Sequence, residues 1–454
     1  MTIGTKILLL AVSLTVAVIV ISLMVSNYSA RKALEQAAFN KLTAVREMKS
    51  QQIEDYFQSI RHQVVTFSES QMIVDAMRSF SDSFSSIKGE LVPRMEDYAD
   101  AGTVLRRYYE EEFIPRLGRN LQTTPDLARY MPSGETTQLL QYLYIGGNEN
   151  PTGEKHLLDA ASDYTSYSST HRKFHPAIRS YLEKFGYYDI FLVDINTGHI
   201  VYSVFKEVDY ATSLLTGPYK NSNFARAFRE AREAGERDFV SVVDFAHYAP
   251  SYNDEASFIA SPIYDGDKKI GVLLFQMPVN RINDIMTNKQ SWSDVGLGAT
   301  GETYIVAEDF TLRNQSRFLI EDRDQYLSVL AEVGTPAKTI ARINSLNTSI
   351  GLQKVETAGT RAALAGKFGT LISPNYRGVE VLSAFGPLEI SGMHWAIMSE
   401  IDEAEAFQHI RELRNRMFGL GLLLIALVGL VSYTLSRTLT RPIRTLGEAA
   451  QSLT

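Results

Sequence analysis

Polar and aromatic side chains that could bind a small molecule are concentrated in one short segment beside an expected strand. These residues are Asp244, His247, Tyr248, Tyr252 and Asp254. A tyrosine hydroxyl forms hydrogen bonds while its ring packs on apolar surface, and a carboxylate can pair with a ligand ammonium group. The segment is therefore a candidate ligand-binding site. The alternative, which the residues leave open, is a loop closed by hydrogen bonds of its own tyrosines and aspartates.

A second group of such side chains lies on or after an expected β-hairpin. Its members are Tyr202, Lys206, Asp209, Tyr210 and Tyr219. We expect this group to lie opposite the first, so that both line one pocket.

Catalytic and metal-binding patterns are weak. His171 and His175 stand four residues apart, which would place both rings on one helical face, but no third ligand accompanies them. The sequence favours an exposed basic turn, His171-Arg172-Lys173, over a metal site. Gly296, Gly298 and Gly301 match a dinucleotide-binding glycine pattern but precede an expected strand, so we reject it. No metal, cofactor or catalytic residue is predicted, and the chain is not expected to be an enzyme.

The elements that would position the candidate site change from helix to strand near Tyr187. Expected strands are Tyr187–Asp194, Ile200–Val204, Phe239–Phe245, Ser257–Tyr264 and Ile270–Val279, with a helix at Phe224–Ala234 ended by a left-handed Gly235. This is the order of a PAS-like α/β sensor module. A second, smaller module follows, with strands expected at Thr303–Ala307, Thr311–Arg317, Val379–Phe385 and His394–Ile401.

A long amphipathic helix is expected ahead of these modules, over residues 30–80. Its apolar stripe consists of Leu42, Val45, Ile53, Tyr56, Ile60, Val64 and Phe67. Such a stripe needs a partner, either the folded domain of the same chain or a second subunit. We take it as a candidate dimer seam. The following region, 81–132, is expected to be mainly helical with breaks at its prolines.

Two uncharged segments, Ile7–Val25 and Met417–Leu435, are long enough to cross a bilayer as helices. The first is expected to be an uncleaved anchor rather than a signal peptide. Arginines flank the second on both sides, so charge does not decide the orientation. The net charge of -7 is spread along the chain, and no nucleic-acid partner is expected. There is no cysteine, so disulfides are excluded.

The order of long helix, two modules and second apolar segment resembles the double-Cache sensor domains of bacterial transmembrane receptors. The fragments that carry this resemblance are Gly296–Val306 (GLGATGETYIV), Phe385-Gly386-Pro387 and Trp395–Glu400 (WAIMSE). It covers roughly residues 30 to 410 and implies an α+β fold with a small ligand bound in the membrane-distal module. Amino-acid-binding members carry an arginine and a tryptophan-tyrosine pair where this chain has Gly217–Asn221 (GPYKN). The ligand class therefore stays open.

The tail resembles the start of a HAMP relay. Thr440–Leu446 (TRPIRTL) includes Pro442, and the apolar residues after it form a heptad seam: Ile443, Leu446, Ala450 and Leu453. The alternative is an ordinary basic juxtamembrane helix. HAMP domains are cytoplasmic, so this resemblance implies the orientation of both apolar segments. Only a first HAMP helix is expected here, and the sequence given includes no output domain.

The predicted organisation is 1–6 cytoplasmic, 7–25 transmembrane, 30–80 stalk, 81–290 distal module, 291–410 proximal module, 417–435 transmembrane and 436–454 HAMP helix. We predict a homodimeric receptor in the bacterial inner membrane that binds a small extracytoplasmic ligand. It would signal to a cytoplasmic output, as in methyl-accepting chemotaxis proteins. Membrane-bound nucleotide cyclases and sensor histidine kinases are the alternatives. An extracytoplasmic enzyme or an adhesion protein is disfavoured.

Overall fold

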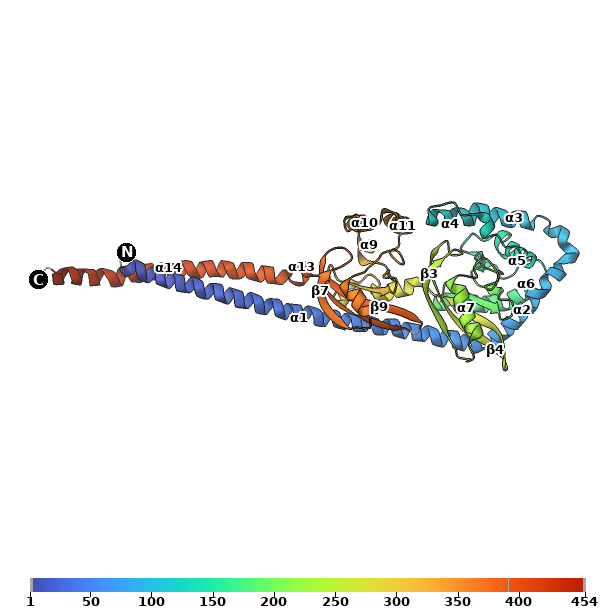
Figure 1. The fold of residues 1–454 in the computed structure, drawn as a ribbon, viewed down its shortest axis with the longest axis horizontal. Helices are drawn as coiled ribbons and strands as arrows, with labels where there is room; N and C mark the ends of the chain where they lie inside the picture. The colour runs from blue at the N-terminus through green and yellow to red at the C-terminus, as the bar shows by residue number, and fades with distance from the viewer. Residues whose placement is uncertain (1–2, 391, 452–454) are drawn as a thin grey trace.

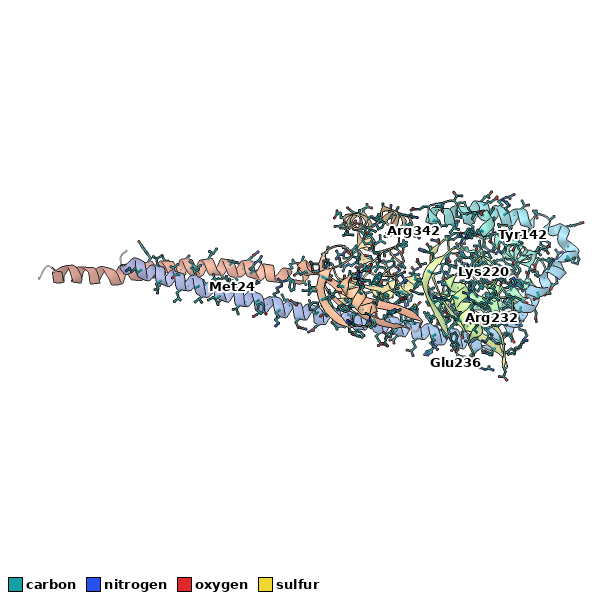
Figure 2. All side chains as sticks on the ribbon, in the orientation of Figure 1. Met24, Tyr142, Lys220, Arg232, Glu236 and Arg342 are labelled. Carbon is teal, nitrogen blue, oxygen red and sulfur yellow. The ribbon has the colours of Figure 1, made fainter. Side chains whose placement is uncertain are left out.

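Two long helices form a rod that carries the rest of the chain at one end (Figure 1). A computed structural model describes residues 3–390 and 392–451. Helix α1 (Ile3–Glu69) runs along the rod and continues past both sheets, while α14 (Gln408–Gln451) returns beside its first half and extends beyond its N-terminal end. The side chains packed around the sheets form two modules, and Met24 lies out on the rod (Figure 2).

Short helical segments separate α1 from the first sheet. They are α2 (Gln71–Leu91), η1 (Val92–Tyr98), α3 (Ala101–Tyr108), η2 (Tyr109–Phe113), α4 (Ile114–Leu121), η3 (Leu127–Arg129), α5 (Glu135–Gln141), η4 (Tyr142–Gly146), η5 (Lys155–Leu157) and α6 (Ser166–Phe185). The expected helical region is thus present. Pro93 and Pro115 coincide with changes of helix type rather than with gaps: Pro93 lies where α2 passes into the 3-10 segment η1, and Pro115 where the π segment η2 passes into α4.

The first sheet has five antiparallel strands in the order β2-β1-β5-β4-β3. The strands are β1 (Asp189–Asp194), β2 (Ile200–Ser203), β3 (Ser241–Tyr248), β4 (Asp254–Asp265) and β5 (Lys268–Gln276). Both faces are covered, so β1 is a continuous apolar run: Ile190 and Leu192 belong to one core, Phe191 and Val193 to the other. Helix α7 (Asn223–Glu233) packs on the second face, and α1, α2 and α6 cover the first.

One detail of this module differs from expectation. Helix α7 ends at Glu233, but Gly235 is not among the residues with a positive φ, so the predicted left-handed cap is wrong. The chain instead leaves the helix through Ala234 in an extended conformation (ψ 141°), for which glycine is not required.

The second sheet has four antiparallel strands in the order β6-β9-β8-β7. They are β6 (Glu302–Ala307), β7 (Gly369–Pro374), β8 (Glu380–Ile390) and β9 (Met393–Asp402). Around them lie α8 (Val279–Met286), η6 (Trp292–Val295), α9 (Arg317–Glu321), α10 (Arg323–Glu332), α11 (Ala337–Leu346), α12 (Ala358–Leu364) and α13 (Glu403–Ala406). The expected strand at Thr311–Arg317 is wrong: only isolated bridges form at Thr311 and Leu312, and Arg317 starts α9.

The apolar stripe of α1 packs on the sheets of its own chain. Ile53 and Val64 are completely buried, and the Phe57 ring meets Trp395 of β9 edge to face at 5.6 Å. The stripe is therefore not available as a dimer seam, and that prediction is wrong. The helix also ends earlier than predicted, because Ser70 interrupts it and caps α2 through a hydrogen bond from the Ile73 N–H.

Both predicted membrane segments lie in helices long and apolar enough to cross a bilayer, the first in α1 and the second in α14. Their apolar side chains, such as Leu10 and Leu422, are exposed. Helix α14 continues through the predicted HAMP segment to Gln451. The side chains of Pro442, Ile443, Leu446 and Ala450, and the whole of Leu453, lie outside the part of the chain that the structure describes.

Candidate ligand-binding site

The loop after β2 carries four of the ten predicted site residues into the interior of the five-stranded module. The backbone here is held by Asp189 at the start of β1. Its carboxylate accepts hydrogen bonds from the backbone N–H groups of Val204 (2.9 Å) and Phe205 (3.0 Å) and from the Ser203 hydroxyl (3.0 Å). Two non-glycine residues of the loop, Lys206 and Ala211, have left-handed backbones with φ of 65° and 66°. Such conformations are strained, so the surrounding contacts must hold them.

Three carboxyl groups are buried together in this loop and strand. Besides Asp189, Glu207 accepts hydrogen bonds from the Tyr188 and Ser251 hydroxyls, both at 2.9 Å. Asp209 accepts one from the Tyr248 hydroxyl at 2.5 Å. Burial raises the pKa of Asp209 to about 6 and also raises the pKa values of Asp189 and Glu207. The neighbouring Asp209 charge adds to the shift of both.

The Lys206 ammonium lies among three tyrosine rings. Its Nζ is 4.7 Å from the ring centroid of Tyr202, 5.1 Å from that of Tyr210 and 5.7 Å from that of Tyr144. It also donates a hydrogen bond to the Ser203 carbonyl oxygen. Burial lowers the pKa of Lys206, and Asp189 acts in the opposite direction. The rings and carboxylates together form a setting for a positive charge.

Two histidines close the far side of this cluster. His171 and His175 lie on α6, completely buried, with ring centroids 4.3 Å apart. His175 Nε2 lies 2.7 Å from the His156 carbonyl oxygen and so carries the proton, which leaves Nδ1 to accept from the Tyr202 hydroxyl at 2.7 Å. Burial and the Lys206 charge lower the pKa of both. The predicted exposed basic turn is wrong, because both rings are buried within helix α6, where carbonyl oxygens lie within hydrogen-bond distance of His171 Nδ1 (Asp159, 2.6 Å) and His175 Nε2.

A small pocket of about 60 Å³ leads to the cluster from the surface. Half-exposed Arg116 and exposed Gly153 line it, together with Tyr252, and Lys206 and Glu207 lie at its inner side. Drug-sized ligand sites are roughly 300–1,000 Å³, so only a small ligand fits without movement of the loop. Larger hollows, of about 610 and 690 Å³, are open grooves beside α1 and contain none of the predicted residues.

The structure thus brings together one part of the predicted site. The residues in or around the cluster and pocket are Tyr202, Lys206, Asp209, Tyr210, Tyr219, Tyr248 and Tyr252. Three others lie elsewhere. Asp244 points toward Arg313 near the four-stranded module, His247 contacts Glu255 at 2.8 Å, and Asp254 is exposed.

Sequence reasoning missed several residues that complete the cluster: Tyr144, Tyr167, His175, Tyr188, Asp189 and Glu207. Glu207 stands between two predicted residues and could have been included on that ground. Asp189 is the first residue of an otherwise apolar strand, and no sequence pattern marks a single carboxylate there as part of a binding site. Among the described residues no group of three metal-ligating side chains comes together.

Two antiparallel sheets on one long helix, with a polar cluster enclosed in the first, define an α+β ligand-binding sensor domain. Residues 26–410 match the family model dCache_1, described as a Cache domain. The match covers most of the chain, which therefore belongs to the Cache-domain family. The glycine pattern at Gly296–Gly301 precedes β6, in agreement with its rejection as a cofactor loop.

Solved ligand-binding domains are also similar to this chain. That of the Pseudomonas aeruginosa PAO1 chemoreceptor PctC, in complex with GABA, is 11% identical, with 66% of this chain and 95% of that chain covered and a TM-score of 0.30. That of PctB from the same organism, in complex with L-Arg, is 17% identical, with 56% and 83% covered and a TM-score of 0.31. The extracellular domain of a proposed histidine kinase, rpHK1S-Z16, is 12% identical, with 50% and 76% covered and a TM-score of 0.31. No protein with a curated description matches the sequence.

Proposed function

We propose that this chain is a transmembrane receptor that binds a small extracytoplasmic ligand in the five-stranded module. The observation that supports it most is the enclosed polar cluster around Lys206, reached by a small pocket, within a Cache domain. Burying a group of carboxylates and tyrosines lowers the stability of the fold. Clusters of this kind occur mainly at functional sites, and ligand recognition is one such function.

The proposed route of the signal starts at this cluster and ends in the cytoplasm. The ligand would favour one packing of the modules over another, and the change would pass through β9 and α14. A HAMP helix over 436–454 would receive it. We place the receptor in a bacterial cell membrane as a homodimer with both apolar helices in the bilayer. The favoured output is of the chemoreceptor type. The PctB and PctC domains belong to chemoreceptors. A nucleotide cyclase or histidine kinase is the alternative.

A thermal-shift screen of the full chain in detergent tests the binding function. The library contains amines, amino acids, organic acids, purines and divalent cations. A ligand that binds only the folded state raises the melting temperature by mass action. We expect at least one class to do so, and we expect Asp209→Asn and Tyr202→Phe to reduce the shift at least fivefold.

The matched controls are exposed residues of the same types, Asp238→Asn and Tyr164→Phe, which should leave the shift unchanged. A hit that the cluster variants do not affect would move the site elsewhere. A screen without any hit would contradict small-ligand sensing.

A further inference from the structure

The cluster already holds a cation in the place best suited to bind one. Three tyrosine rings surround the Lys206 Nζ at 4.7–5.7 Å, within the distance over which a cation is attracted to a ring face. Aromatic cages of this kind recognise ammonium groups of ligands in other proteins. Here the ammonium belongs to the protein itself.

Carboxyl groups outnumber cations at this site. Asp189, Glu207 and Asp209 are each at most 8% exposed, while the cations enclosed to the same degree here are Lys206 in the cluster and Lys155 in the pocket. Groups on the other elements do not change this. His171 and His175 of α6 are held neutral by burial, and Arg179 on the same helix pairs with Asp159 at 2.8 Å.

The two cations at the mouth of the pocket have hydrogen-bond partners there. Arg116 pairs with Glu112 at 2.9 Å, and the Lys155 ammonium donates to the Asn148 carbonyl oxygen at 2.6 Å. The carboxyl groups without a cation of their own therefore lie at the inner end, where Lys206 and Glu207 line the pocket.

Three buried polar atoms of the cluster have no hydrogen-bond partner among the described residues. They are Asp209 Oδ1, the Tyr219 hydroxyl and His171 Nε2. Asp209 is completely buried and Tyr219 is 5% exposed. An ionised carboxylate oxygen can only accept hydrogen bonds, so the missing partner of Asp209 Oδ1 is a donor group. An ammonium N–H is a strong donor to a carboxylate because the hydrogen bond is charge-assisted.

The position of Lys206 is also a strained one. Its left-handed backbone is held by a hydrogen bond from its own N–H to the Ser203 hydroxyl oxygen at 2.9 Å, and that hydroxyl in turn donates to Asp189. A loop held in such a conformation can relax when its contacts are replaced. Lys206 lines the pocket and occupies the tyrosine cage, so it stands between the two.

We propose that the Lys206 ammonium is a tethered occupant of a cation site, and that a small primary alkylammonium compound binds there by displacing it. This inference rests on the proposed function, since it names the ligand class of the same site. The incoming ammonium would take the place among the rings of Tyr202, Tyr210 and Tyr144 and supply donors to the carboxylates. The Lys206 side chain would move toward the pocket.

The test compares propylammonium with propionate and propanol on the full chain in detergent. Lys206→Met keeps an unbranched side chain, shorter by one atom, and removes the tethered charge. We expect the Kd of propylammonium, measured by calorimetry, to fall at least tenfold in this variant, while propionate and propanol remain unaffected. Lys206→Arg keeps a competing charge and should bind propylammonium no more tightly than the wild type.

A second measurement uses the wild-type chain, so that it stands even where Lys206→Met fails to fold. Lys206 is 2% exposed. Displacement should raise its rate of reductive methylation, followed by mass spectrometry, at least fivefold when propylammonium is present and not when propionate is present. Because propylammonium also consumes the reagent, the rate is expressed relative to that of exposed Lys220 in the same mixture.

The outcomes separate the two proposals. Propionate binding that is lost in Lys206→Met would make Lys206 an anion-binding residue and overturn this inference, while the receptor function would stand. Unchanged propylammonium affinity in Lys206→Met, or unchanged labelling, would overturn it as well. The receptor function fails only if no class of ligand shifts the melting temperature in the wider screen.

Discussion

Two glutamates face each other across neighbouring strands of the four-stranded sheet. Glu302 of β6 and Glu400 of β9 are register partners and both are buried. Glu302 accepts hydrogen bonds from the Arg317 N–H and the Tyr376 hydroxyl, both at 2.6 Å, and Glu400 accepts one from the Ser383 hydroxyl at 3.0 Å. Burial raises the pKa of Glu400 to about 7, and the Glu302 charge adds to the shift.

This arrangement predicts how stability depends on pH. The folded protein holds a proton on Glu400 more tightly than the unfolded chain, so stability from this group falls as pH rises from about 4.5 to about 7 and is constant above. A shift from 4.5 to about 7 corresponds to roughly 3 kcal/mol. We expect the melting temperature of the wild type to fall over this range and Glu400→Gln to show a clearly smaller fall.

Exposed Glu389 on the adjacent strand provides the control, because Glu389→Gln should keep the wild-type slope. Other buried carboxyls with raised pKa values, such as Asp209, contribute in the same direction. The prediction therefore concerns the difference between variants in how the melting temperature changes with pH. Equal changes for Glu400→Gln and the wild type would contradict it.

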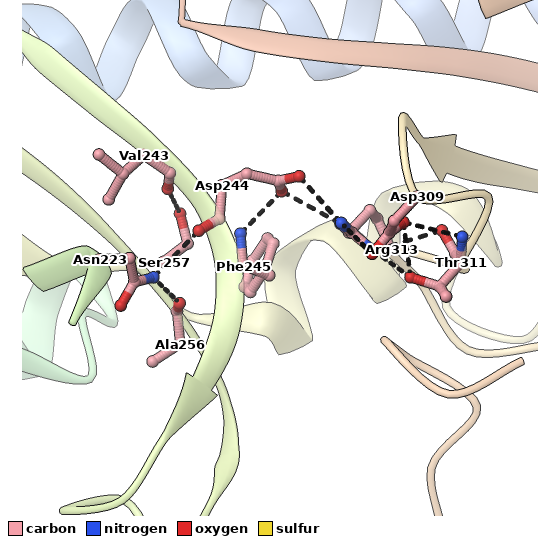
Figure 3. Close-up of polar contacts among 9 residues, drawn as sticks. All are labelled: Asn223, Val243, Asp244, Phe245, Ala256, Ser257, Asp309, Thr311 and Arg313. Atoms are coloured by element: carbon pink, nitrogen blue, oxygen red, sulfur yellow. Dashed lines mark hydrogen bonds and ion pairs between the residues drawn. The ribbon is translucent and has the colours of Figure 1, made fainter. Parts of the chain in front are cut away.

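At the scale of elements, one arginine connects strand β3 to the four-stranded module (Figure 3). The Arg313 side chain is 4% exposed and contacts Asp244 at 2.9 Å and Asp309 at 3.2 Å. Asp244 lies where the pairing of β3 with β4 is irregular. The Asn223 amide at the start of α7 donates to the Asp244 carbonyl at 3.0 Å. A movement of α7 or β3 would therefore be transmitted to Arg313.

A double-mutant cycle measures this connection. Arg313→Met removes the cation and leaves Asp244 partly buried without its partner, which should destabilise the protein by roughly 1–3 kcal/mol. Adding Asp244→Asn to the Arg313→Met variant should cause little further loss of stability. The coupling energy should therefore be a large part of the loss caused by Arg313→Met alone. The measurement is denaturant unfolding of the four proteins.

The exposed pair Arg237 and Asp267 is the matched comparison, since both side chains are largely in solvent. Its cycle should give a coupling close to zero. If the Arg313 cycle gives no more than this pair, the contact between modules has no energetic importance.

Elements could be predicted from the sequence where burial requires a run of apolar residues. Buried polar residues could not be predicted, because their hydrogen-bond partners are distant in the sequence. Strands β1 and β5 could be predicted because both faces are covered and their central residues are apolar, and β4 because its buried stretch is mainly apolar despite Ser257 and Ser261. Strand β7 was missed: it is an edge strand of alternating exposure, with Gly369 and Pro374 at its ends. His171 and His175 were predicted to be exposed because polar residues usually face solvent. Their burial depends on hydrogen bonds to the carbonyl oxygens of Asp159 and His156, which the sequence does not reveal.

At the scale of the whole molecule, the two apolar helices lie side by side within one chain (Figure 1). The Ser26 hydroxyl contacts the Met417 sulfur at 3.7 Å. A Cβ at Gly421 would lie 3.1 Å from Ile19 Cγ2, so the glycine permits close approach of the helices. Helix α1 passes both sheets and α14 leaves the second one, so relative motion of the modules would become relative motion of these two segments.

Because the chain has no cysteine, this pairing can be tested by cross-linking in native membranes without further substitutions. Ile19→Cys with Gly421→Cys should form a disulfide within one chain under mild oxidation, seen as a faster-migrating band of monomer mass that a reductant removes. Val18→Cys with Leu422→Cys is the control, since both side chains are exposed in the single chain. It should not cross-link within a chain, but a dimer that buries these faces would give a band of twice the mass. A double-mass band from the first pair would instead mean that the two helices pair between subunits, and the signal would then have to cross the dimer rather than travel within one protomer.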